Sequence, residues 1–210
     1  MLICLLLFVG LSIGGYLVAI TCQAYTWKYV LKPGTMVLIM IIAYLKVDEV
    51  GIFGWLILLG LFFSMLGDIF LMLPSDRFIL GLVSFFIAHV IYVVAFPAKR
   101  EISGVTLFEI FVLVAIATIF FLYLRSGVNQ EGGIILQVAV LLYISVISLM
   151  VFRALQSGMF FLIVGAFLFY LSDAILAWNR FVRKYRWGEL GVMITYFLAQ
   201  TLFAVSLWFL

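Results

Sequence analysis

The stretch Ile52–Leu73, IFGWLILLGLFFSMLGDIFLML, decides the fold class of this chain. Apart from Asp68, it contains no acidic or basic residue. A transmembrane helix needs about 20 largely apolar residues in succession. The stretch meets this requirement, so it predicts a helix that crosses a membrane and carries one carboxyl group with it.

The composition of the whole chain agrees with this segment. The 210 residues are 68% apolar and only 10% charged, whereas a soluble domain is about half apolar and about a quarter charged. These values exclude a water-soluble globule, a disordered chain and a nucleic-acid-binding protein. They predict an all-α polytopic membrane protein whose surroundings are membrane lipids.

Cutting the chain at its charged, proline and glycine clusters gives eight apolar runs. We therefore expect one domain, residues 1–210, built as a bundle of eight transmembrane helices. The connections are too short for a soluble domain, so any activity must lie inside the bundle or at its mouth. Pro33 is expected to open the second helix, Pro74 to close the third and Pro97 to close the fourth. The runs are Leu2–Thr21, Pro33–Leu45, Ile52–Leu73, Phe78–Phe96, Val105–Leu124, Gly133–Phe152, Met159–Trp178 and Leu190–Leu210. The second run is short, and the helix itself is expected to start earlier, near Trp27.

The basic residues predict the orientation of this bundle. The odd-numbered loops hold eight of them, Lys28, Lys32, Arg77, Arg125, Arg180, Arg183, Lys184 and Arg186, and the even-numbered loops hold four, Lys46, Lys99, Arg100 and Arg153. Because basic loops stay in the cytosol, we expect the odd loops there and both termini outside. The minimal loops favour a bacterial inner membrane.

Three ionisable residues lie within the apolar runs: Asp68, Asp173 and His89, the only histidine in the chain. A charged group at the centre of a bilayer costs about 2.5–3.5 kcal/mol on insertion scales, so such residues usually face the bundle interior and mark a functional site. These three are the candidate catalytic residues.

Other polar residues accompany them at helical spacing or at similar depth. Asp68, Asp173 and Lys32 lie toward the odd-loop side, so we expect them to converge in one cavity that opens to the cytosol. Lys32 stands just before Pro33, where the helix dipole disfavours a cation, so helix stability does not account for it. The candidate substrate-binding residues are Lys32, Ser64, Tyr92, Tyr143, Ser172, Tyr196 and Gln200.

A short internal similarity links the two aspartates. The segments 66–71 and 171–176 both follow the pattern Leu-small-Asp-x-x-Leu, and both run in the same direction along their helices. This pattern suggests a 4+4 internal repeat, in which a four-helix unit is duplicated.

The polar residues, taken in order, resemble the YhhN-like integral membrane family over residues 30–205. The resemblance rests on Ser64-x-x-Gly67-Asp68-x-x-Leu71, Phe78-x-x-Gly81, Phe85-x-x-x-His89-x-x-Tyr92, Lys32-Pro33, Tyr143, Ser172-Asp173 with Leu176, and Tyr196-x-x-Ala199-Gln200. It implies eight helices and lysoplasmalogenase activity, the hydrolysis of the vinyl ether bond of a lysoplasmalogen. The implied partner is therefore a lysophospholipid, and the products are a fatty aldehyde and a glycerophospho-headgroup compound.

This implied reaction suits two carboxyl groups. Acid opens a vinyl ether by protonating its β-carbon, and water attacks the resulting oxocarbenium ion, as in glycoside hydrolysis. We expect Asp173 to be the acid, since desolvation favours the neutral form of a carboxyl. Asp68 is expected to be its ionised partner, kept charged by Lys32 and His89, although Lys32 is alternatively a candidate ligand of the lipid phosphate. The tyrosine hydroxyls are expected to hold water or substrate.

Two other functions fit some of these residues. Asp and His inside spans also mark proton relays, so a proton-coupled transporter is one alternative, although no helix looks broken in its middle. A metal-dependent membrane lipid hydrolase is the other, because one His and two Asp form a known ligand set. The chain has no second histidine, and Cys4 and Cys22 lack metal-ligand spacing, so we expect neither a metal nor another cofactor.

Overall fold

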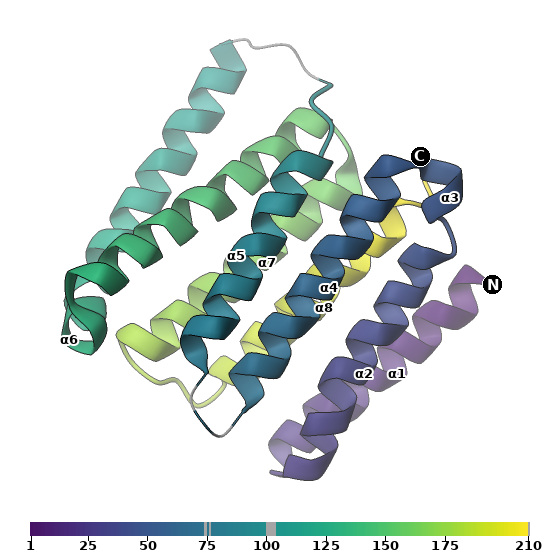
Figure 1. Ribbon diagram of the computed structural model, residues 1–210, viewed down its shortest axis with the longest axis horizontal. Coiled ribbons are helices and arrows are strands. Elements are labelled where there is room, and N and C mark those ends of the chain that lie inside the picture. The colour runs from purple at the N-terminus through teal and green to yellow at the C-terminus, as the bar shows by residue number, and fades with distance from the viewer. Residues whose placement is uncertain (74, 76, 100–103, 210) are drawn as a thin grey trace.

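The computed structural model describes residues 1–73, 75, 77–99 and 104–209, with the backbone alone at 104–105. Every regular element in this described part of the chain is a helix, which confirms the all-α prediction (Figure 1). Pro74 and Arg100, which the sequence analysis placed in loops, lie outside the described residues. The helices are α1 (Leu2–Thr21), α2 (Tyr25–Tyr44), α3 (Val47–Val50), α4 (Ile52–Met72), α5 (Phe78–Ala95), α6 (Gly104–Ser157), α7 (Phe160–Phe181) and α8 (Gly188–Ser206).

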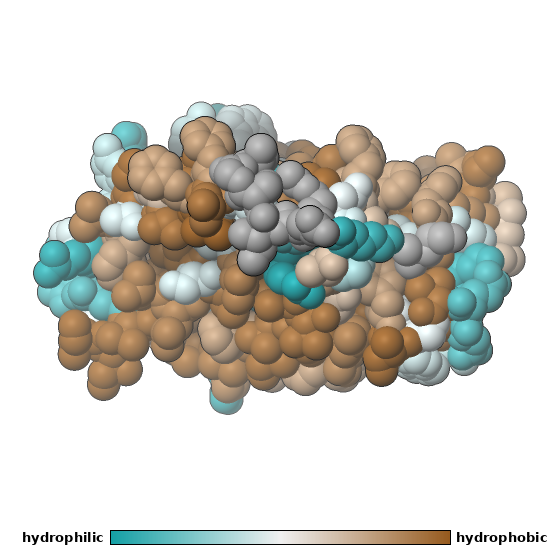
Figure 2. Space-filling model, turned by 90° about the horizontal axis from the view of Figure 1, so that it is seen from above, coloured by the Kyte–Doolittle hydropathy of each residue, from teal (hydrophilic) through white to brown (hydrophobic). Residues whose placement is uncertain are grey.

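Within the described residues, seven of the helices, all except the short α3, are long and apolar enough to cross a membrane. Large apolar side chains such as Ile52, Leu107 and Ile135 point outward from them. Figure 2 shows the same property on one face, where brown apolar surface dominates and hydrophilic residues gather in patches. The chain is therefore an integral membrane protein.

Helix α6 contains two of the expected runs. Its 54 residues would extend about 80 Å at 1.5 Å per residue, far beyond the roughly 30 Å of a hydrocarbon core. Gly132 and Gly133 have non-helical dihedrals, with φ +61° at Gly133, a conformation that favours glycine. The chain reverses there, and the two limbs run back beside one another (Figure 1). The helix continues beyond Leu124, where we had expected it to end.

The central helices pack α4 on α5 and α7 on α8, and α2 contacts both α4 and α8. The first limb of α6 lies at the edge of the molecule (Figure 1). Gly67 of α4 allows a close approach, because a Cβ there would lie 2.6 Å from the ring of Phe85 in α5. The main apolar core, which includes Met36, Leu61 and Phe169, lies between these helices.

The prediction that Pro33 opens the second helix was wrong. Helix α2 starts at Tyr25, so Lys32 and Pro33 lie inside it. The missing N–H of Pro33 removes one bond of the helix, but neighbouring helices make proline tolerable within transmembrane segments. The start is amphipathic, with exposed Tyr25 and Trp27, as is common at a membrane interface. It lies two residues before the start near Trp27 that the short apolar run suggested. Pro97 follows the end of α5, as predicted.

Candidate active site

Asp68 lies one turn before the end of α4 and forms a buried ion pair. Its Oδ1 atom is 2.9 Å from Nζ of Lys32, and the two side chains are 3% and 8% exposed. Lys32 reaches Asp68 because α2 packs against α4 and has already begun seven residues earlier. A buried charge needs a partner of opposite sign, so this contact favours the charged form of Asp68.

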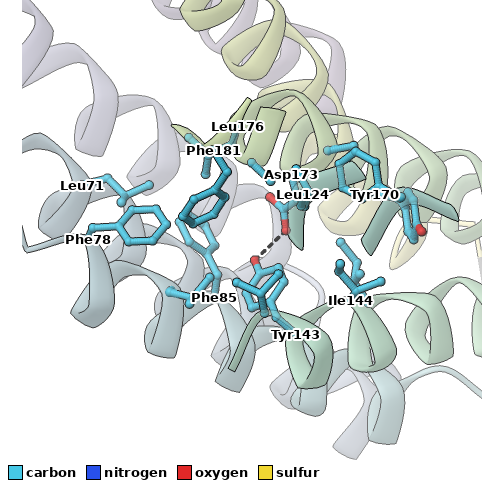
Figure 3. Close-up of a pocket in the computed structure, with 16 residues that line it drawn as sticks. Leu71, Phe78, Phe85, Leu124, Tyr143, Ile144, Tyr170, Asp173, Leu176 and Phe181 are labelled. Atoms are coloured by element: carbon cyan, nitrogen blue, oxygen red, sulfur yellow. Dashed lines mark hydrogen bonds between the residues drawn. The ribbon is translucent and has the colours of Figure 1, made fainter. Parts of the chain in front are cut away.

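Asp173 lies in α7 and has uncharged or weakly basic neighbours instead. The hydroxyl of Tyr143, in the second limb of α6, donates a hydrogen bond to its Oδ2 atom at 2.5 Å (Figure 3). The Nε2 atom of His89, in α5, is 3.5 Å from the same oxygen. The close contact of His89 is thus with the carboxyl of Asp173, whereas we expected it to support Asp68. The helical spacing of the sequence shows on which face of its helix His89 lies. It does not show which helix packs against that face.

Both carboxyl groups line one polar cavity of about 620 Å³, a size typical of small-molecule sites. The start of α2, the ends of α4 and α7 and the start of α8 surround it. This arrangement confirms that side chains from the odd-loop end of the bundle converge. Of the candidate residues, the cavity lining includes Lys32, Asp68, Ser172, Asp173 and Tyr196.

A second, apolar pocket adjoins this cavity and has a volume of about 50 Å³. Aromatic and aliphatic side chains such as Phe78, Leu124 and Phe181 form its wall, and the close-up shows Tyr143 and Asp173 pointing toward one another across it (Figure 3). Five residues line both spaces, and Asp173 is the only acidic or basic one among them in the described chain: Leu71, Phe78, Phe85, Asp173 and Leu176. Asp173 therefore stands at the boundary between a polar and an apolar space.

The remaining candidates line neither space, apart from Tyr143 in the apolar pocket. Tyr92 donates a hydrogen bond to Oε1 of Gln200 at 2.9 Å, and Ser64 lies against Tyr92. These three side chains are fully buried. From the sequence we expected these residues to bind substrate, but in the structure they form a polar layer that joins α4, α5 and α8. His89 is likewise fully buried and reaches the cavity only through its contact with Asp173.

Ser172 and Tyr196 differ from that buried layer, because both line the polar cavity. The hydroxyl of Ser172 donates to the carbonyl of Val192 at 3.0 Å and so ties α7 to α8. Tyr196 is close enough to Asp68 for the two side chains to interact electrostatically. Tyr196 thus lies beside the ion pair.

The mouth of the cavity contains residues that the sequence analysis did not assign to a site. Tyr25 and Lys28 contribute from α2, Glu189 from α8, and Lys184 and Arg186 from the connection between α7 and α8. Lys28 forms an ion pair with Glu189. The basic residues of that connection had been interpreted as an orientation signal. Their position directly after the Asp173 helix was the available hint that they also lie near the site.

The arrangement is suited to acid–base chemistry on an amphiphile. One carboxyl is fixed beside a lysine, the other is held by a phenol and an imidazole, and both face a space that accepts polar groups. Among the residues that the structure describes, no group of three His, Cys, Asp or Glu side chains is placed to hold a metal ion.

The sequence of this chain is similar to those of known proteins. The YhhN family model matches residues 27–207. The rat protein named lysoplasmalogenase TMEM86B is 30% identical over 181 residues, which are 86% of this chain and 73% of the rat protein. The human protein of the same name is 33% identical over 143 residues, covering 68% of this chain and 59% of its own.

The bacterial relatives match a shorter region. The uncharacterized membrane protein YhhN of Escherichia coli O157:H7 is 32% identical over 79 residues, 37% of this chain and 38% of the relative. No solved structure matches the fold.

Proposed function

This chain belongs to the YhhN family, and we propose that it is a lysoplasmalogenase, a membrane hydrolase that cleaves the vinyl ether bond of a lysoplasmalogen. The observation that carries the proposal is the position of Asp173, between a polar cavity and an apolar pocket. The name of the rat and human relatives points to the same activity.

The substrate, like the site, has a polar part and an apolar part. A lysoplasmalogen joins an apolar alkenyl chain to a polar glycerophospho-headgroup, and the vinyl ether is the junction. With the headgroup in the polar cavity and the first carbons of the chain entering the apolar pocket, this junction falls at Asp173. The pocket wall of Phe78, Leu124 and Phe181 matches the chain.

Asp173 is the proposed acid. Oδ2 accepts the hydrogen bond of Tyr143, which leaves Oδ1 to carry the proton. Asp173 gives that proton to the β-carbon, the electron pair of the C=C bond forms the new C–H bond, and the ether oxygen shares its lone pair to give an oxocarbenium ion. His89 and Tyr143 act here as positioning residues that fix the carboxyl.

Asp68 is the proposed base, because its pairing with Lys32 keeps it charged. Its negative charge stabilises the oxocarbenium ion, and it takes the proton that water releases on adding to that ion. The hemiacetal then passes its hydroxyl proton to the leaving glycerol oxygen and separates into aldehyde and alcohol. The proton on Asp68 returns to Asp173, which closes the cycle.

The other candidate residues have supporting roles in this proposal. Tyr196 and Ser172 line the cavity and help to orient water and the glycerol hydroxyls. Ser64, Tyr92 and Gln200 hold α4, α5 and α8 together behind the cavity, since their hydroxyl and amide groups are buried. We assign no cofactor to the reaction.

We further propose that the chain crosses the membrane eight times, as two related units of four helices. Each limb of α6 counts as one crossing. Gly60 and Gly165 support the relation, because each lies eight residues before the aspartate of its helix and each lies under an aromatic ring of the next helix, Tyr92 and Phe203 respectively. A side chain at either glycine would overlap that ring.

The proposed orientation places the cavity mouth in the cytosol of a bacterial inner membrane, with both termini outside. The loops around the mouth are those that carry the greater number of basic residues. A reporter that is active only in the cytosol tests this orientation. It should be active when inserted between Val182 and Trp187 and inactive at the C-terminus, and the opposite result would reverse the orientation.

The activity itself is tested with the purified protein in detergent micelles and 1-alkenyl-glycerophosphocholine. Aldehyde and glycerophosphocholine should form in equal amounts. The matched 1-alkyl ether, which has no double bond to protonate, should remain intact. A wild-type protein that releases no aldehyde from any lysoplasmalogen would overturn the proposed function.

A further inference from the structure

The charges at the cavity mouth are not balanced. Of the five basic residues that line the cavity, Lys28, Lys32 and Arg180 form ion pairs with Glu189, Asp68 and Glu131 respectively. Lys184 and Arg186 also line the cavity, and among the described residues neither has a carboxylate partner. Arg186 has its guanidinium group 4.9 Å from the ring centre of Trp187.

These two cations occupy a place where an anion is favoured. They lie in the connection 182–187, directly before the first residue of α8. The N-terminus of a helix carries a partial positive charge and free N–H groups, which attract phosphate groups. Glu189, in the first turn of α8, offsets part of the field of this helix end, so the two basic side chains, which line the same cavity as Asp68 and Asp173, supply most of the attraction.

We infer that Lys184 and Arg186 form the subsite that binds the phosphate of the substrate. The inference rests on the proposed function and names the part of the lysophospholipid that the enzyme recognises. A phosphate bound at the mouth fixes the headgroup end of the molecule, so that the vinyl ether is held at Asp173 and the chain extends into the apolar pocket.

The same geometry indicates that the amine of the headgroup is not recognised. The carboxylate at the mouth that would attract an ammonium is Glu189, and it is already neutralised by Lys28. The tyrosines nearby, Tyr25 and Tyr185, are 68% and 65% exposed and do not enclose a cation. The subsite thus selects phosphate-bearing alkenyl lipids over neutral ones, and choline and ethanolamine headgroups are equivalent to it.

The test compares two substrates in neutral detergent micelles, 1-alkenyl-glycerophosphocholine and the phosphate-free 1-alkenylglycerol. Wild type should prefer the phosphorylated substrate in kcat/KM by about tenfold or more, the scale of one charge-assisted contact. The double variant Lys184→Gln/Arg186→Gln should lose this preference through a raised KM for the phosphorylated substrate, with kcat nearly unchanged. Arg183→Gln is the matched control, because Arg183 belongs to the same connection and is exposed but does not line the cavity; its preference should equal that of wild type.

The possible outcomes separate the explanations. Equal kcat/KM of wild type for both substrates would overturn the phosphate subsite and leave the proposed function intact, whereas inactivity on both would overturn the proposed function. Equal effects of Arg183→Gln and the double variant, abolished when anionic lipid is added to the micelles, would show that the cations bind the membrane surface and not the substrate. A strong preference for choline over ethanolamine would contradict the claim that only the phosphate is recognised.

Discussion

Asp68 and Asp173 are the same residue in the same short sequence pattern, yet their surroundings differ. Asp68 is 3% exposed and 2.9 Å from a lysine ammonium. Asp173 is 10% exposed and is held by the neutral hydroxyl of Tyr143, with His89 beside it. The partner supplied by the adjacent helix, and not the pattern around the aspartate, therefore determines what each carboxyl can do.

The largest expected effect follows from the proposed role of Asp173 as the proton donor. Asp173→Asn should lower kcat at least about 10²-fold, the scale of a positioned acid, with little change in KM. Aldehyde release by the purified variant measures this. Asp48→Asn, a change at an exposed carboxyl of α3, is the control and should behave as wild type. An Asp173→Asn protein with near-normal turnover would remove Asp173 from the mechanism.

The two aspartates should differ next in stability. Asp68→Asn strands the ammonium of Lys32 in a buried position, and breaking such a pair costs roughly 3–5 kcal/mol, so its melting temperature in detergent should fall clearly. Asp173→Asn has no lysine or arginine to strand among the described residues and should melt near wild type.

Restoring neutrality distinguishes the ion pair from a general effect of the substitution. Lys32→Met combined with Asp68→Asn removes both charges and should regain much of the lost stability while remaining inactive. If the melting temperatures of Asp68→Asn and Asp173→Asn fell equally, the contrast between the two carboxyls would be lost. Both aspartates would then serve mainly to stabilise the fold.

The outline of this site could be predicted from the sequence, because a charged residue within an apolar run is costly to bury and is easily recognised. An aspartate within an apolar run must face a protected interior, and its depth in the run indicates the end of the bundle where it lies. The convergence of Asp68, Asp173 and Lys32 follows from these two facts. The same reasoning found the helices whose whole length is apolar.

Features that depend on which helices pack against one another could not be predicted from the sequence. Sequence reasoning assigned His89 to Asp68 and not to Asp173, because a sequence shows the polar face of a helix but not the helix that packs against it. It also placed Pro33 at the opening of α2, although the helix begins at Tyr25. It also divided α6 at Leu124, although the helix continues to the glycines at 132 and 133. The basic residues of the connection 182–187 were visible, but only the fold brings them to the cavity.

A smaller effect is expected from the hydroxyl of Tyr143. Tyr143→Phe removes the hydrogen bond to Oδ2 of Asp173. A hydrogen bond between neutral groups contributes about 0.5–1.5 kcal/mol, so kcat should fall by about two- to tenfold. Tyr123→Phe, at an exposed tyrosine in the first limb of α6, is the matched control. A Tyr143→Phe enzyme with unchanged kcat would show that this contact does not position Asp173.

Removal of divalent ions should have no effect at all. A metal bound between the two aspartates would make them equivalent ligands, and it would have to compete with the lysine ammonium that already pairs with Asp68. The single histidine is fully buried, and the described residues offer no trio of ligating side chains. We therefore expect full activity after prolonged dialysis against a chelator, measured as aldehyde release before and after. A loss that one divalent ion restores would mean that the carboxyls act together as ligands, and the difference in partners between Asp68 and Asp173 would then no longer explain the chemistry.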